Sequence, residues 1–260
     1  MSSSLISVVM NCHNGEKYLR ESLNSIINQT YKDWELIFFD NFSSDQSKKI
    51  LKEFKDKRIK YFKSDKFINL YDARNLAVEK CNGNFISFLD TDDIWFNDKL
   101  EKQIELYKKD QNCSLIYSNC NIYDERKKTE KVFVKNKLPQ GNITQELLNN
   151  YRVGLLTILV KKEVFINNAF NPNYNIIGDF DFVLKLSLNS KFAGVDKPLA
   201  RYRRHNKNFS EKYLSMYIAE VRDWIKNNTN IYKEKGYSLI YQKILLKKLQ
   251  IKKIFKNLKF

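Results

Sequence analysis

Short apolar runs alternate with amphipathic stretches along the first half of the chain, and this alternation limits the possible folds more than any other feature. Runs rich in β-branched and aromatic residues occur at 5–10, 34–39, 59–62, 85–89 and 114–117. Stretches with helical spacing separate these runs, at 18–27, 45–54, 71–80 and 98–107. The repeated order of strand and helix predicts an α/β fold, in which helices flank a Rossmann-like, mainly parallel sheet.

Polar residues follow three of the predicted strands directly. They form the segments "NCHNG" from Asn11, "DNFSSD" from Asp40 and "DTDD" from Asp90. Open α/β sheets bind ligands beyond the carboxyl ends of their strands, near the point where the strand order reverses. The three segments are therefore expected to converge on one edge of the sheet and to form a ligand site there.

Three carboxylates lie within four residues in the stretch "FISFLDTDDIW" at 85–95. Neighbouring carboxylates repel, so a positive partner is expected. The chain lacks both the G-x-G-x-x-G fingerprint and the P-loop, which excludes the usual backbone cradles for phosphate. Mn²⁺ or Mg²⁺ held by these carboxylates could bind a diphosphate instead. The alternative is that the aspartates only favour the dipole of the next helix, for which Asn97 or Asp98 is better placed.

Composition is that of a folded, cytoplasmic protein. With 260 residues, 43% of them hydrophobic, the chain can bury a substantial core. It has no apolar run of membrane-spanning length, and its start lacks the basic region and cleavage site of a signal peptide. Four cysteines without a C-x-x-C pair, and only two histidines, are expected to be free buried thiols rather than a zinc site: Cys12, Cys81, Cys113 and Cys120.

Positive charge is concentrated at the end of the chain. Residues 201–260 hold 16 Lys and Arg against 4 Asp and Glu, which is +12 of the net charge of +16. The pattern beyond Asn206 is helical, and near the end apolar residues at helical spacing alternate with lysines: Ile251, Lys252, Lys253, Ile254, Phe255, Lys256, Leu258 and Lys259. Two interpretations stay open. Residues 236–260 could attach to an anionic membrane surface, or they could pack on their own domain with a solvated lysine face.

Four segments in this order resemble the inverting nucleotide-sugar glycosyltransferases of family 2, which have the A-type fold. The segments are "ISVVMNCHNGEKYLRESLNSIINQTYKDWELIFFDNFSSD", "DARNLAVEKCNGNFISFLDTDDIW", "GDFDFVLKLS" and "YRRHNKNFS". The resemblance covers about residues 4–210. It implies a catalytic domain at 1–210, followed by a basic helical C-terminal extension at 211–260.

The resemblance also implies roles for individual residues. Asp179, in "GDFDF", matches the position of the general base. The implied metal ligands are Asp92, Asp93 and His205. The implied donor-binding residues are Asn11, Asp40, Asn41, Arg74, Asp90 and Asp92. Inverting transfer needs a base for the acceptor hydroxyl on one side of the sugar and positive charge for the leaving diphosphate on the other, so Asp179 is expected to lie apart from the metal.

Each role has a structural alternative. Asp179 could cap the helix that follows it, and Asp40 could cap a turn with Ser43 and Ser44. Arg74 could merely pair with a neighbouring carboxylate, and His205 could be an ordinary surface residue.

The chain also departs from the family pattern at the end of the first strand, which reads "NCHN" from Asn11, and at two single positions. Asn41 replaces the second aspartate of the base-binding pair, and Gly178 replaces the acid before Asp179. A carboxylate only accepts hydrogen bonds whereas an amide also donates them, so the change at Asn41 leaves the nucleotide base in doubt.

Two other classes of function fit the sequence less well. A haloacid-dehalogenase-type phosphohydrolase also has D-x-D after a strand, but its later acidic motif would end at Val183. A basic membrane- or nucleic-acid-binding protein without catalysis would explain the tail but not the acidic loop. The sequence therefore predicts a metal-dependent inverting glycosyltransferase that uses a nucleotide-diphosphate sugar, with a UDP-sugar favoured. Its expected acceptor is a hydroxyl of a surface glycan or lipid-linked saccharide. Its expected location is the cytoplasm, with attachment to the inner face of the cell membrane left open, and nucleic acid is not an expected partner.

Overall fold

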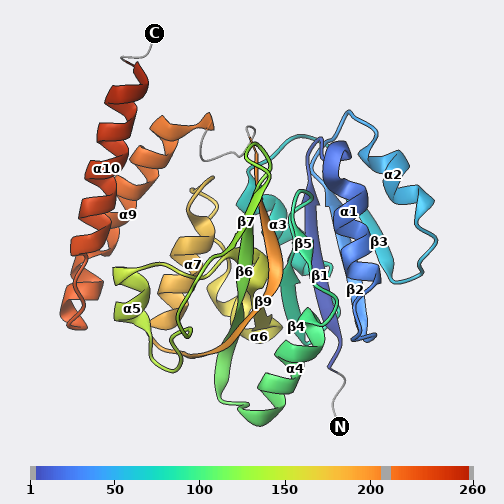
Figure 1. Ribbon diagram of the computed structural model, residues 1–260, viewed down its shortest axis with the longest axis horizontal. Coiled ribbons are helices and arrows are strands. Elements are labelled where there is room, and N and C mark those ends of the chain that lie inside the picture. The colour runs from blue at the N-terminus through green and yellow to red at the C-terminus, as the bar shows by residue number, and fades with distance from the viewer. Residues whose placement is uncertain (1–3, 206–211, 258–260) are drawn as a thin grey trace.

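A nine-stranded sheet runs through the centre of the molecule, as the computed structural model shows in Figure 1. The structure describes residues 4–205 and 212–257, with side chains up to residue 255. Eight strands follow the order β3-β2-β1-β4-β8-β6-β9-β5, and β7 pairs with β6 outside this path. The strands are β1 (Ile6–Cys12), β2 (Trp34–Asp40), β3 (Ile59–Lys63), β4 (Phe85–Phe88), β5 (Ile94–Trp95), β6 (Cys113–Asp124), β7 (Thr129–Val132), β8 (Leu159–Lys161) and β9 (Lys191–Arg204).

The first half of the sheet, β3-β2-β1-β4, is parallel throughout. Its crossovers are α1 (Glu16–Ile27), α2 (Ser47–Glu53) and α3 (Leu70–Glu79). Val8 packs in the core that contains Leu19 and Leu23 of α1, while its neighbour Val9 packs in the other core, with Ala77 of α3. Since successive side chains of a strand point to opposite faces, helices cover both faces, and β1 is buried along its whole length.

The second half of the sheet is mixed. β8 pairs antiparallel with both β4 and β6, β6 and β9 are parallel, and the short β5 pairs antiparallel with β9. β6 and β7 pair antiparallel and form a hairpin through the segment at 124–129. The α/β fold class is thus confirmed, with the parallel arrangement concentrated between β3 and β4.

Seven further helices and helical turns complete the described part of the fold. They are α4 (Lys99–Lys109), α5 (Thr144–Asn149), the 3-10 turn η1 (Leu155–Thr157), α6 (Lys162–Asn168), α7 (Gly178–Ser187), and the C-terminal pair α9 (Leu214–Glu234) and α10 (Ile240–Asn257). The expected helical end of the chain is confirmed for α9 and α10, while residues 206–211 and 258–260 lie outside the described part. Among the described helices, none has the length and apolar character needed to cross a membrane.

The C-terminal helices share a core with the rest of the chain. Trp224 and Val221 of α9 belong to the same buried cluster as Phe182 of α7 and Val9 of β1. The division into domains at residue 210 stays a prediction. In the structure, one buried cluster contains residues from both sides of this position. All four cysteines are free and buried, as expected.

Candidate active site

The carboxyl ends of β1, β2 and β4 meet at one edge of the sheet. Cys12 at the end of β1 pairs with Asp40 at the end of β2, and Val9 pairs with Phe88 of β4. Asn11 and Asp90 each lie two residues beyond that last pair, so the neighbouring strands bring them to the same edge. The three polar segments therefore converge as the sequence predicts.

The acidic loop at 90–93 is attached to the end of β9. The antiparallel pair of Ile94 and Arg201 aligns β5 with β9. Two residues further along β9, Arg203 donates its backbone N–H to Asp93 Oδ1 (2.8 Å) and its side-chain Nε–H to the backbone oxygen of Asp92 (2.9 Å). This register brings the "YRRH" segment beside the acidic loop, although the two are more than 100 residues apart in sequence.

The three carboxylates of this loop have different surroundings. Asp93 is only 3% exposed, and burial, followed by the negative charges of Asp92 and Asp90, raises the pKa of its carboxyl well above the usual range. Asp90 and Asp92 have side chains that are 42% and 29% exposed. Asp93 therefore joins the loop to β9, while Asp90 and Asp92 are the carboxylates that a ligand can reach.

Each accessible carboxylate has a basic partner from another element. Asp90 Oδ1 lies 2.6 Å from the guanidinium of Arg74, a buried residue of α3. Asp92 Oδ2 lies 2.9 Å from Nε2 of His205. The positive partner expected from the sequence is thus supplied in part by the chain itself, and Arg74 does pair with a neighbouring carboxylate.

Asp179 lies in the first turn of α7, beside Tyr71 of α3. The hydroxyl of Tyr71 donates to Asp179 Oδ1 at 3.0 Å. Burial raises the pKa of Asp179, and the charge of Arg74 and the hydrogen bond from Tyr71 oppose that rise. Ile177 occupies the N-cap position of α7, so Asp179 is not the cap of this helix. A carboxyl with a raised pKa next to a buried cation is suited to exchange a proton.

Gly178 departs from the family pattern for a steric reason. A Cβ atom at this position would lie 2.6 Å from ring carbons of Tyr71, closer than real Cβ contacts allow. The Tyr71 ring therefore excludes any side chain from the position before Asp179.

Asp40 and Asn41 both hold loops in this structure. Asp40 is 1% exposed, and its two oxygens accept hydrogen bonds from the backbone N–H of Ser43 (2.7 Å) and the hydroxyl of Tyr61 (2.8 Å). The Asn41 amide donates to the backbone oxygen of Ile68 (2.9 Å) and accepts from the backbone N–H of the same residue (3.1 Å). The turn expected as the structural alternative for Asp40 is therefore present with Ser43.

Asn11 differs from these two residues, because its side chain has no partner. It is buried, and among the described residues neither its amide nitrogen nor its amide oxygen has a hydrogen-bond partner. Buried polar atoms without partners are rare and costly. Nearby, His13 Nδ1 lies 2.9 Å from the backbone oxygen of Asn41, and its ring packs against the exposed ring of Phe67. The end of β1 therefore offers both an unused amide and an aromatic surface.

A contact that the sequence does not reveal comes from α9. The buried carboxylate of Glu220 accepts three backbone N–H groups of residues 175–177, at 2.7, 2.9 and 3.1 Å. Four residues later, Trp224 donates its indole N–H to Asp181 Oδ1 at 2.8 Å. α9 therefore holds the segment that leads into α7 and so fixes the position of Asp179.

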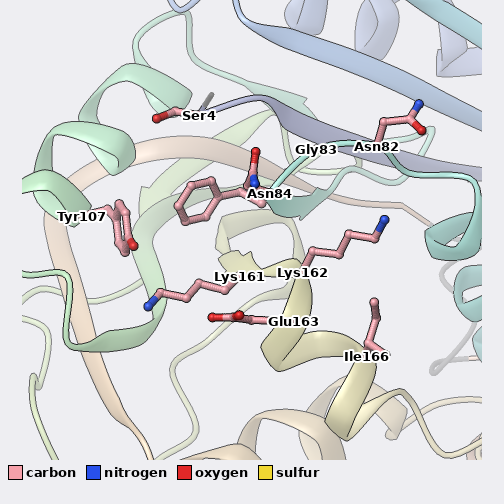
Figure 2. Close-up of a pocket in the computed structure, with 10 residues that line it drawn as sticks. Ser4, Asn82, Gly83, Asn84, Tyr107, Lys161, Lys162, Glu163 and Ile166 are labelled. Carbon is pink, nitrogen blue, oxygen red and sulfur yellow. The ribbon is translucent and has the colours of Figure 1, made fainter. Parts of the chain in front are cut away.

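One cavity lies away from these residues. It has a volume of about 490 Å³ and opens near the amino ends of β1 and β4, where Asn82, Lys161 and Lys162 line it (Figure 2). The two ammonium groups already donate to the backbone oxygens of Gln111 and Cys81. Since the perturbed carboxyls and the unpaired amide lie at the opposite end of the strands, that end is the candidate active site.

A protein-family model described as "Glycosyl transferase family 2" matches residues 7–166, which is more than half of the chain. The chain belongs to glycosyl transferase family 2. This glycosyltransferase is 34% identical over 188 residues to the Escherichia coli UDP-Glc:alpha-D-GlcNAc-diphosphoundecaprenol beta-1,3-glucosyltransferase WfgD, which covers 72% of this chain and 71% of the relative. It is 28% identical over 209 residues to the putative teichuronic acid biosynthesis glycosyltransferase TuaG of Bacillus subtilis, which covers 79% of this chain and 81% of that one.

Solved structures confirm the A-type fold of this glycosyltransferase. The structure of S. aureus TarS 1-349 in complex with UDP aligns with a TM-score of 0.67 at 20% identity, over 83% of this chain and 65% of that one. The mannosyltransferase PcManGT from Pyrobaculum calidifontis, in complex with GDP-Man and Mn²⁺, aligns with a TM-score of 0.67 at 13% identity, over 93% of this chain and 69% of that one. The chain thus spans just under two thirds of the TarS fragment.

Proposed function

We propose that this glycosyltransferase moves one sugar, with inversion, from a nucleotide-diphosphate donor to a hydroxyl of a surface glycan or lipid-linked saccharide. The observation that carries the proposal is the presence of two carboxylate centres, the acidic loop at 90–93 and Asp179, both of which interact with Arg74. One is the accessible Asp92 with His205, and the other is the buried Asp179 with Tyr71. Arg74 pairs with Asp90 of the first centre, and its charge lowers the pKa of Asp179 in the second.

The first centre would hold a divalent cation, Mn²⁺ or Mg²⁺. An exposed carboxylate and an adjacent imidazole are suitable ligands, and Mg²⁺-type sites often use one or two protein ligands with substrate phosphate and water. Within 4–205 and 212–255, no group of three or more His, Cys, Asp or Glu residues is arranged to hold a metal ion, so the cation would also need the donor's phosphates and water as ligands. Asp93 is only 3% exposed and its Oδ1 accepts the Arg203 N–H, so we assign the cation to the more accessible Asp92 and to its partner His205. When bound, the cation would supply positive charge for the leaving diphosphate.

The second centre would take the proton. As the acceptor oxygen bonds to the anomeric carbon and the bond from that carbon to the diphosphate oxygen breaks, the proton of the acceptor hydroxyl passes to Asp179. The raised pKa of Asp179 favours this uptake, and the Tyr71 hydrogen bond orients the carboxylate. Arg74 would stabilise negative charge between the two centres, next to the donor phosphates.

The nucleoside would lie over the ends of β1 and β2. The unpaired amide of Asn11 can both donate to and accept from a base or ribose. Each oxygen of Asp40 has a second lone pair for the same ligand, and Asn41 would act by shaping the loop at Ile68. A UDP-sugar is favoured because the Escherichia coli relative is named for UDP-Glc and the TarS structure contains UDP.

The acceptor class follows from the names of the relatives. One is named for a sugar on diphosphoundecaprenol, and another for teichuronic acid biosynthesis. We propose a comparable acceptor for this chain, used at the inner face of the cell membrane, and no nucleic-acid partner.

Nucleotide binding tests the donor and metal assignments together. Thermal unfolding is measured with UDP, GDP, dTDP and CMP, each with and without Mn²⁺. UDP with Mn²⁺ is expected to raise the melting temperature most, since a ligand that binds only the folded state stabilises it. Asp92→Asn is expected to remove the part of the shift that depends on Mn²⁺, while the control Asp110→Asn, at the exposed end of α4, keeps it.

No shift with any nucleotide in either condition would contradict the proposal. A salt-dependent and metal-independent affinity for nucleic acid would favour the non-catalytic alternative instead.

A further inference from the structure

Five large apolar side chains of α10 are exposed on one side of the helix. They are 40% to 63% exposed, and their spacing of three, four or seven residues brings them onto one helical face: Ile240, Ile244, Ile251, Ile254 and Phe255. Single exposed apolar residues are common on protein surfaces, whereas several on one helical face indicate a contact surface. We refer to these five residues as the apolar stripe.

The opposite face of α10 is packed against the protein. Leu249 is buried, and the buried Gln242 donates its amide to the backbone oxygen of Leu148 in α5. α10 lies beside α9 at the outer edge of the molecule (Figure 1). The helix is therefore anchored through one face, and the apolar stripe points away from the domain.

Lysines lie beside the apolar stripe and, at Lys247, within it, along the described part of the helix. All five are exposed, namely Lys243, Lys247, Lys248, Lys252 and Lys253, and no acidic residue follows Glu234 in the chain. Their alkyl stems can lie along apolar surface while the ammonium groups reach anionic groups beside it. The combination of an apolar stripe and cationic flanks is typical of helices that lie in a membrane interface.

We propose that the apolar stripe and its lysines bind the surface of an anionic lipid bilayer. A second copy of the chain fits less well, because its own lysines would face these lysines across the contact in a protein of net charge +16. A nucleic acid would neutralise the lysines but leave the apolar stripe in water. A bilayer surface satisfies both requirements, since acyl chains bury the apolar side chains and lipid phosphates lie beside the ammonium groups.

This surface would also orient the candidate active site, a consequence that rests on the proposed function. α10 runs in the same direction as β1, so its C-terminal half lies on the side of the molecule to which the carboxyl ends of the strands point (Figure 1). A bilayer held against the outer face of α10 would lie at the edge of the molecule and reach the level of the end that carries Asp92 and Asp179. A saccharide linked to a membrane lipid is the acceptor class that this arrangement suits.

Vesicle flotation tests the proposal without any substrate. The full chain is mixed with vesicles of phosphatidylcholine alone, or with phosphatidylglycerol added, at low and high salt. We expect binding to the anionic vesicles that weakens as salt rises, because screening shortens the range of charge attraction. Ile251→Asn, Ile254→Asn and Phe255→Asn combined should lower the bound fraction at least about tenfold, since three apolar side chains no longer enter the interface.

Matched controls separate this effect from damage to the fold. Ile166→Asn changes an equally exposed isoleucine on α6, at 59% exposure, and should leave vesicle binding unchanged. Substitution is preferable to removal of residues 236–260, because removal would uncover the surface that Leu249 and Gln242 cover. Unchanged circular dichroism of the triple variant would confirm that the packed face is intact.

Three results would overturn the proposal. They are absence of wild-type binding to anionic vesicles, equal binding by the triple variant, and a wild-type dimer that the triple variant converts to monomer, which would assign the stripe to a second copy. If the triple variant loses vesicle binding but still transfers sugar to a water-soluble acceptor, the result would support a membrane role of the stripe that is separate from catalysis. If the wild type transfers no sugar, the proposed function is contradicted. The vesicle experiment would still decide whether the apolar stripe binds a bilayer.

Discussion

Tyr71 contacts three residues that the proposed reaction uses or that surround it. Its hydroxyl donates to Asp179, its ring excludes a side chain at Gly178, and the guanidinium of Arg74 lies 5.2 Å from the ring centroid. The sequence does not indicate this role, because the hydroxyl and the carboxylate are 108 residues apart in the chain. A single buried tyrosine therefore controls both the position and the proton affinity of the proposed base.

Tyr71→Phe is predicted to move the acid limb of the pH profile of kcat/KM to higher pH. The hydroxyl stabilises ionised Asp179 and so lowers its pKa, and its removal leaves burial to raise that pKa further. The ring stays in place, so packing against Gly178 is kept. Initial rates measured across the acid range give the result.

Tyr151→Phe is the matched control for this change. The Tyr151 hydroxyl lies 3.5 Å from the backbone oxygen of Asp179 rather than from its carboxylate. Its removal should leave the acid limb where it is. An unmoved limb in Tyr71→Phe, with normal folding, would show that Asp179 is not the group that titrates.

Lys99 is a buried cation without a carboxylate partner among the contacts described for it. Its ammonium donates to Ser87 Oγ (2.9 Å) and Gln103 Oε1 (2.7 Å), and it lies 4.0 Å from the ring centroid of Trp95. Burial lowers the pKa of Lys99 well below its usual value of 10.5. Lys99 is therefore a source of pH-dependent stability.

Lys99→Met is predicted to flatten the pH dependence of unfolding. Between the lowered pKa and 10.5 the unfolded chain binds one more proton than the folded chain, so the free energy of unfolding rises with pH by up to about 1.4 kcal/mol per pH unit. Methionine cannot titrate and removes that contribution. Urea unfolding of both proteins at several pH values below 10.5 measures the two slopes, and equal slopes would contradict the prediction.

The roles of single residues are only partly readable from the sequence. The "DTDD" pattern correctly indicates a cluster of carboxylates at a strand end, because a buried strand and its polar end are local features. It does not reveal that Asp93 is buried against Arg203, whereas Asp92 is accessible beside His205. That difference depends on the register between β5 and β9, which pairs Ile94 with Arg201.

At the scale of elements, α9 supports α7 through one carboxylate. Glu220 satisfies three N–H groups of 175–177, just before the turn that carries Asp179. Without the Glu220 carboxylate, these three backbone N–H groups would lose this hydrogen-bond acceptor close to the core, which costs free energy of folding. α9 is therefore part of the support of the candidate active site.

Glu220→Gln is predicted to lower kcat by about 10-fold to 100-fold with little change in donor KM. Only one oxygen remains to accept the three N–H groups, so the start of α7 shifts, and displacement of a catalytic group by about 1 Å can cost about 100-fold. Steady-state kinetics separate kcat from KM. Glu234→Gln, an exposed change on the same helix, should be neutral. A raised donor KM with unchanged kcat would contradict the prediction that Glu220 acts only by positioning Asp179.

Long buried elements are predictable from the sequence and short ones are not. β1 and β2 are continuous apolar runs because both of their faces are covered. β5 has two residues and β8 has three, which is too short for any periodic pattern. These short strands nevertheless join the acidic loop to β9 and connect the parallel half of the sheet to the mixed half.

At the scale of the whole molecule, the C-terminal helices combine two different uses. Their inner faces complete the main core, and the outer face of α10 carries the apolar stripe and the lysines. The sequence alone left packing and membrane attachment as alternatives for this helix. In the structure the packed face and the exposed stripe are opposite sides of one helix, so packing and membrane attachment are compatible.

A fragment of residues 1–210 is predicted not to unfold cooperatively. It lacks the five buried apolar side chains of α9, namely Leu214, Ile218, Val221, Trp224 and Tyr232. At about 1.5–3 kcal/mol for each buried apolar side chain, their loss is comparable to the whole stability of a typical domain. Thermal melting followed by circular dichroism tests this. A fragment of residues 1–239, which keeps α9, should still melt cooperatively, and a sharp transition in the 1–210 fragment would contradict the prediction.

The most direct test of the account is the Asp179→Asn variant, measured for donor binding and for sugar transfer. Asparagine keeps the size of the side chain and can still accept the Tyr71 hydrogen bond, but it cannot take up the acceptor's proton. Titration calorimetry with the nucleotide-sugar and Mn²⁺ should give a Kd close to that of the wild type, because Asp92 and His205 are unchanged. Transfer should fall at least about 100-fold, the lower range for loss of a general base. Transfer at the wild-type rate would contradict the assignment of Asp179 as the base.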